Sequence, residues 1–157
     1  MSAKGIWLSE EAVVVPILPS SSAVSGTVES DFFTMKNAAH ASILVMSAVT
    51  GSAVTVQVLE ATGHGGTSGT AIAFDYAEQS TASSDIYLAV AAATSGGLST
   101  SARDNMSWII EIDASKLSDG YPFVGIRLSS AASTVISAYA ILTGIRYAED
   151  INLTALT

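Results

Sequence analysis

Apolar and polar residues alternate over several short stretches of this chain. In the segment AVTVQVLEA, Val54, Val56 and Val58 fall on one side of an extended strand, while Thr55 and Gln57 fall on the other. Successive strand residues point to opposite faces, so this pattern is typical of a strand with one face buried. The segments MSWIIEID and PFVGIRL alternate in the same way. We therefore expect β-sheet with one face against a core.

Short apolar runs between Gly, Ser, Asn and Asp turns predict further strands. Such regular spacing is typical of an all-β fold, here an antiparallel β-sandwich of jelly-roll-like type. The segment TVISAYAIL is apolar on both faces, which predicts a central strand covered on each side or a strand at a subunit contact. The segment DASKLSDG predicts one helical turn linking two strands, with Asp113 as its cap and Gly120 at its end. The further strands are expected at Ala12–Leu18, Ser30–Met35, His40–Val49, Thr70–Tyr76 and Asp85–Ala91.

The length of 157 residues is that of a single domain. Pro16, Pro19 and the segment SSSAVSG separate an N-terminal extended arm, residues 1–30, from a β-sandwich domain, residues 31–157. Proline in a strand is confined to edges and bulges. The apolar arm is therefore expected to add itself to the sheet edge of a neighbouring subunit.

Charged residues make up only 13% of the chain, against about 25% in an average protein. So much neutral surface favours contacts between subunits. The net charge of −8, with six Lys and Arg, disfavours nucleic acid as a partner, because that binding depends on cationic side chains. The N-terminus has no predicted secretion signal, and the uncharged span 37–59 is expected to form strand and turn instead of a membrane helix.

The glycine-rich stretch EATGHGGTSGTAIAF is the part of the sequence most like a functional loop. A phosphate-binding P-loop needs a Lys after its glycines and a following helix, and neither is expected here. The HGG of His64–Gly66 is similar to an esterase oxyanion loop, but no G-x-S-x-G elbow accompanies it. We therefore interpret the loop as a turn between two strands, with His64 exposed to solvent.

The remaining candidates for chemistry are weak. Cysteine is absent, the two histidines lie on separate predicted elements, and no calcium-loop motif occurs, so we predict no metal and no cofactor. Acidic residues on a sandwich can form a glycosidase pair, but nothing in their spacing selects two of them. We predict no catalytic residues. The carboxylates considered were Asp75, Asp85, Glu111 and Asp113.

Aromatic residues are candidates for the core or for an interface. Trp108, Tyr139 and Phe74 are assigned to the core, whereas Trp7 precedes the apolar run AVVVPILP of the arm and is expected at an interface. The candidate interface residues are Trp7, Val13, Val15, Ile17, Phe32, Phe33 and His64.

Four segments between about residues 31 and 150 resemble small virion structural proteins of tailed bacteriophages and their prophages. They begin with FFTMKNAAH and GTAIAFDY and continue with the link EIDASKLSDGY and the closing AILTGIRYA. The resemblance implies a β-sandwich or jelly-roll subunit, plausibly a capsid decoration or cement protein of the kind that sits as a trimer over junctions between capsomers. It implies no catalytic residues, and the segment before Asp31 falls outside it.

Together these observations predict a non-enzymatic virion structural protein made in the bacterial host cytoplasm and carried on the capsid surface. Its expected partners are the major capsid protein and further copies of itself in a homotrimer, with neither nucleic acid nor membrane. An alternative is a glycan- or receptor-binding sandwich of a head fibre or tail, which exposed aromatics in a shallow groove would favour. A hydrolase acting through one carboxylate or His64 is a third hypothesis.

Overall fold

The computed structural model describes residue 8 and residues 12–19, 24–49, 51–66, 69–82, 84–100 and 103–145, without the side chains of 24, 49 and 130–133. These residues form an all-β protein, and the short 3-10 helix η1 (Ala114–Lys116) follows β10. The strands are β1 (Val13–Leu18), β2 (Val24–Glu29), β3 (Phe33–Thr34), β4 (His40–Val49), β5 (Thr55–Ala61), β6 (Thr70–Ile72), β7 (Phe74–Glu78), β8 (Ala91–Ala93), β9 (Leu98–Ser99), β10 (Met106–Asp113) and β11 (Phe123–Thr143).

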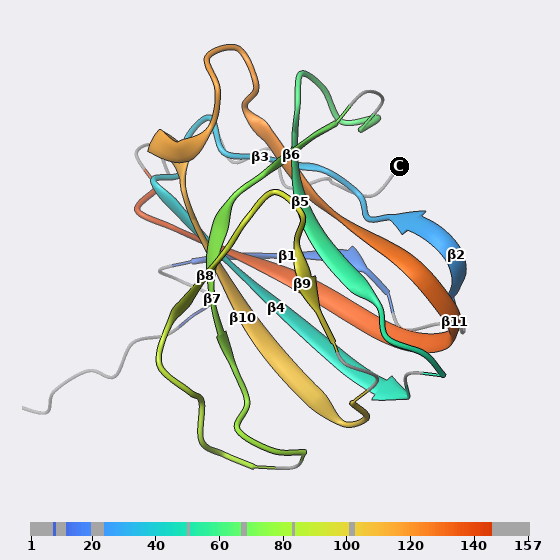
Figure 1. Cartoon of the computed structure of the whole chain (residues 1–157). Coiled ribbons are helices and arrows are strands. Elements are labelled where there is room, and N and C mark those ends of the chain that lie inside the picture. The colour runs from blue at the N-terminus through green and yellow to red at the C-terminus, as the bar shows by residue number, and fades with distance from the viewer. Residues whose placement is uncertain are drawn as a thin grey trace, which may run out of the picture.

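The strands form two antiparallel sheets packed against each other, which confirms the predicted β-sandwich (Figure 1). The first sheet has the order β1, β11, β4, β10, β7, β8. In the second sheet, β11 lies between β5 on one side and β2 and β3 on the other, and β6 and β9 pair with the far edge of β5. Antiparallel sheets bury one face each, which is why the strand sequences alternate.

One long strand, β11, belongs to both sheets. Residues 123–129 of β11 pair with β5, whereas residues 135–143 of the same strand pair with β4. Figure 1 shows β11 folding over from the second sheet into the first on the side where β2 lies. The predicted strand Thr70–Tyr76 likewise divides at Ala73, with β6 in the second sheet and β7 in the first. These crossings join the two layers around one core.

The core lies between the sheets and is made of the alternating apolar residues. On β10, Trp108 and Ile110 are fully buried, and on β4 so is Ile43. They pack in one cluster with Val58 and Ile126 of the second sheet. Burying such side chains contributes about 1.5–3 kcal/mol each, so this cluster dominates the stability of the fold.

A smaller apolar cluster lies beside the glycine-rich loop. It contains Phe32, Leu59 and Ala61. A Cβ on Gly125 would lie 2.9 Å from the Phe32 ring, and a Cβ on Gly66, whose φ is +59°, would overlap the same ring. The loop is a turn between antiparallel β5 and β6, as predicted, and its Gly66 is needed because the chain closes tightly over Phe32.

Two predicted boundaries need correction. The described part of the arm, residues 12–19 and 24–30, is not separate from the body: β1 pairs with β11 in the first sheet and β2 pairs with β11 in the second. The apolar residues of β1 cover the core of their own chain, and β2 adds the partly buried Val28 to it. The predicted strand Asp85–Ala91 holds only a single bridge at Tyr87, and β8 begins at Ala91.

The link between β10 and β11 contains the predicted helical turn, in η1. Asp113 precedes it but makes no side-chain cap hydrogen bond, because its carboxylate contacts His40 instead. The span 37–59 holds β4 and β5, as the strand-and-turn interpretation predicted. In the part of the chain that the structure describes, no helix has the length and hydrophobicity needed to cross a bilayer.

Candidate functional site

An apolar row crosses the outer face of the first sheet. Leu44 of β4 is paired with Tyr139 of β11 on one side and with Ile109 of β10 on the other. Each of them alternates along its strand with fully buried core residues, so all three point away from the core. The row continues through Pro16 of β1 and Ala77 of β7 at its two ends. We call Pro16, Tyr139, Leu44, Ile109 and Ala77 the outer row.

Two well-exposed apolar side chains flank the outer row. Val14 of β1 is 45% exposed and is paired with Ile141, and Met46 of β4 is 37% exposed and is paired with Ser107. An antiparallel sheet that faces water normally carries polar residues at such positions. Large exposed apolar patches mark protein contacts. This face therefore has the character of an interaction surface.

One residue of the outer row was predicted to lie in the core. Tyr139, predicted in the core, is only partly buried and belongs to the outer face, whereas Trp108 and Phe74 are buried as predicted. The β11 segment TVISAYAIL is apolar on both faces, and the β4 sequence HASILVMSAV has the same property.

A polar cluster closes one end of this face. His40 Nδ1 lies 2.9 Å from Asp113 Oδ1 and His40 Nε2 lies 2.7 Å from Glu111 Oε2. Ser42 donates a hydrogen bond of 2.6 Å to the same Glu111 oxygen. Burial lowers the pKa of His40, but the hydrogen bonds and negative charges of Asp113 and Glu111 outweigh this and raise the pKa above its ordinary value of 6.5.

The arrangement of this cluster holds β4 to β10. Both imidazole nitrogens of His40 face carboxylates, and the Ser42 hydroxyl donates to Glu111 instead of to the imidazole. Asp75, next to Glu111 in register, is paired with Lys116 at 2.5 Å. Among the residues that the structure describes, no group of three or more His, Asp or Glu side chains is placed to hold a metal ion.

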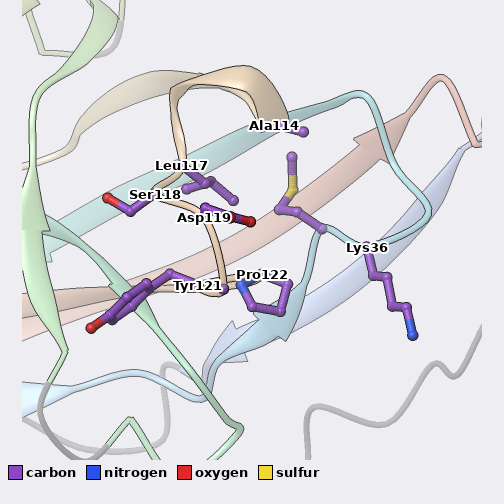
Figure 2. Close-up of a pocket in the computed structure, with 9 residues that line it drawn as sticks. Lys36, Ala114, Leu117, Ser118, Asp119, Tyr121 and Pro122 are labelled. Carbon is purple, nitrogen blue, oxygen red and sulfur yellow. The ribbon is translucent and has the colours of Figure 1, made fainter.

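A hollow with a volume of about 420 Å³ lies at the β10–β11 link. Met35, Leu117 and Pro122 form its apolar part (Figure 2). Figure 2 shows the side chains of Tyr121 and Lys36 extending in opposite directions, so these two groups do not converge on one point. A ligand site needs polar groups that converge on one point, and Tyr121 and Lys36 do not converge in this open hollow.

The predicted interface residues occupy different positions. Five of them are buried in the chain itself, because β1, Phe32 and the start of β3 lie against the sandwich interior. His64 is exposed on the glycine-rich loop, where its ring centroid lies 4.5 Å from that of Phe123. Trp7 lies outside the described residues. The buried five are Val13, Val15, Ile17, Phe32 and Phe33, and they are core residues of the subunit instead of free interface residues.

One exposed apolar segment was missed by the sequence interpretation. Ile86, Leu88 and Val90, between β7 and β8, are 63%, 47% and 66% exposed. The run DIYLAVAAA predicts a strand over Asp85–Ala91. Alternation alone does not show whether a second layer covers a strand, so this exposure required the tertiary structure.

The comparisons with known proteins concern the fold. No family model matches this sequence, and no curated protein matches it. Among solved structures, the chain is similar to the crystal structure of the SPBc2 prophage-derived protein YomS, with a TM-score of 0.50 and 13% sequence identity. The similarity covers 85% of this chain and 94% of that protein. At this identity the two proteins share a fold.

Proposed function

We propose that this chain is a non-enzymatic structural protein of a bacteriophage virion. Its specific role in this proposal is that of a capsid decoration protein, which assembles as a homotrimer and binds the major capsid protein on the outside of the head. The observation that carries the proposal is the outer row with Val14 and Met46: an apolar sheet face that suits burial against a protein.

The apolar character of this face supports attachment to a shell. Removing apolar surface from water contributes roughly 25 cal/mol per Å², and a rigid sheet loses little conformational entropy on binding. Repeated over many subunits, such contacts strengthen a capsid without any chemical reaction. The fold shared with a prophage-derived protein and the four sequence segments that resemble phage virion proteins support the same role.

The charge of the chain supports this location as well. With a net charge of −8 and only six basic residues, the surface repels packaged or free nucleic acid. It also repels anionic cell surfaces. An exterior position on the virion is compatible with both effects.

Capsid binding tests the proposal directly. Purified protein is mixed with phage heads that lack it, and occupancy is measured by co-sedimentation and by electron microscopy of the particles. Met46→Glu and Val14→Asp place a charge on the apolar face, so each is expected to lower occupancy about tenfold or more, because a buried unpaired charge is costly. Thr27→Glu, on exposed β2 of the other sheet, adds the same charge elsewhere and is expected to bind like the unchanged protein.

The outcomes separate the proposal from its alternatives. Failure of the unchanged protein to bind heads, or equal occupancy of Met46→Glu and Thr27→Glu, contradicts attachment through this face. Saturable binding to a glycan, in place of heads, overturns the decoration role in favour of receptor recognition. Circular dichroism spectra of all variants check that the sandwich is retained.

A further inference from the structure

The segment 84–90, which leads into β8, is the most exposed apolar part of the described chain. It contributes four of the large exposed hydrophobic residues, namely Ile86, Tyr87, Leu88 and Val90. Figure 1 shows the connection between β7 and β8 extending away from the body of the sandwich. This segment lies at the edge of the first sheet opposite β1, and its Tyr87 reaches Ser107, the residue paired with Met46.

Hydrogen bonds hold this segment in place while its apolar side chains remain exposed. The Leu88 N–H donates to the Glu78 carbonyl at 2.8 Å, and the Ser80 N–H donates to the Ile86 carbonyl at 2.9 Å. The Tyr87 hydroxyl is hydrogen-bonded to Ser107 Oγ of β10 at 2.5 Å. The exposed apolar groups are therefore presented by an ordered backbone, which lowers the entropic cost of binding.

The chemistry of this surface favours a second copy of the chain as its partner. Residues 79–100 contain a single charged residue, Asp85, in a chain whose net charge is −8. Two copies repel each other over most of their surface, and this region is where like-charged copies approach at least electrostatic cost. A basic partner would instead be drawn to the acidic remainder, whereas identical apolar side chains need no charge complement.

The edge of the sheet adds a second favourable contribution. In the described sheet, β8 pairs with β7 alone, so its other edge has no strand beside it. An open edge is a template for pairing with another chain. Ala91 and Ala92 are exposed and small, which lets a second backbone approach this edge closely.

We infer that copies of this chain associate through the segment 84–90 and the edge of β8, with Ile86, Leu88 and Val90 of each copy packing against those of its neighbours around a rotation axis. The inference rests on the proposed function in that it names the surface through which the subunits would oligomerise. In this inference the connection between β7 and β8 serves self-association of the subunits.

Light scattering and sedimentation velocity over a concentration series test the inference with the full chain. The unchanged protein is expected to form an oligomer. Ile86→Ser and Val90→Ser are expected to weaken self-association about tenfold or more each, and the double variant to be a monomer. Val14→Ser is the matched control, because it removes an exposed apolar side chain from β1, at the opposite edge of the first sheet, and is expected to leave the oligomer intact.

Each result bears on the inference separately from the proposed function. A monomeric unchanged protein, or an oligomer that survives the double variant, overturns the inference. An oligomer lost in the double variant but retained in Val14→Ser supports it, whether or not the protein binds heads. Loss of head binding in Val14→Asp with an intact oligomer supports the two surfaces as independent. Circular dichroism confirms that the double variant remains folded.

Discussion

The imidazole Nε2 of His40 lies 2.7 Å from Oε2 of Glu111, across the pair of strands β4 and β10. Asp113 faces the other ring nitrogen, so the protonated imidazole has a carboxylate on each side. The raised pKa of His40 means that the folded state binds this proton more tightly than the unfolded chain. This clasp therefore links the stability of the sheet to pH.

His40→Gln is expected to remove that linkage. The stabilisation from protonated His40 is fully present below about pH 6.5 and is lost as the pH rises through the raised folded pKa. The difference in unfolding free energy between the unchanged protein and His40→Gln should therefore shrink as the pH rises above about 6.5. Urea denaturation at several pH values measures it. His64 is present in both proteins and cancels, so a difference that is independent of pH contradicts the prediction.

The packing of Phe32 against two glycines predicts an asymmetry within the glycine-rich loop. Gly66→Ala is expected to destabilise the protein by about 1–3 kcal/mol. Residue 66 has a positive φ, and the Cβ of an alanine there would overlap the Phe32 ring. Gly125→Ala should cost a similar amount. Gly63→Ala is the matched control, since a Cβ there meets nothing within 4 Å, and it should be nearly neutral. Thermal and urea denaturation test this, and equal effects at residues 63 and 66 would be incompatible with it.

Glu60 of β5 is hydrogen-bonded to the β10–β11 link. Its side chain is 3% exposed, and its Oε2 accepts a hydrogen bond of 2.7 Å from the Ser118 N–H. Glu60→Ala should destabilise the protein by about 1–3 kcal/mol, because the part-buried hydrogen bond to the Ser118 N–H is lost and a buried side chain is removed. Hydrogen exchange at the Ser118 amide should accelerate. Glu60→Gln keeps an acceptor and should recover part of the loss, so identical behaviour of the two variants would argue against this role.

Removing residues 1–18 is expected to destabilise the sandwich itself. The deletion takes Val15 and Ile17, which are 4% and 1% exposed, from the core and uncovers the edge of β11. Burial of about 1.5–3 kcal/mol for each such side chain makes the loss a large part of total stability. Circular dichroism melting measures it. A truncated chain with an unchanged melting temperature would restore the interpretation of this segment as a separate arm.

The strand pattern of this chain could be predicted because alternation is a local property. Val54, Val56 and Val58 are buried, and Thr55 and Gln57 are not, as their spacing indicated. The turn at the glycine-rich loop was also predictable, since its residues have turn chemistry of their own. The assignment of Trp108 to the core followed from the same periodicity.

The interface assignments were less accurate because a strand sequence does not say what lies on either side of it. Val13, Val15 and Ile17 have the pattern expected of a strand with one apolar face, and the pattern is the same whether that face covers its own core or a neighbour. The structure places them in their own core. The exposed Ile86, Leu88 and Val90 show the converse, an apolar run that no layer of the chain covers.

The sequence by itself determined that this chain forms short antiparallel strands with one apolar face, joined by glycine and polar turns, with few charges on its surface. Only the tertiary structure decided which apolar residues are left over. Burial depends on contacts between strands that are distant in sequence, such as β1 with β11 or Leu44 with Ile109. The outer row and the segment 84–90 emerge only when the sheets have been ordered and stacked, because a surface is defined by what does not pack against it.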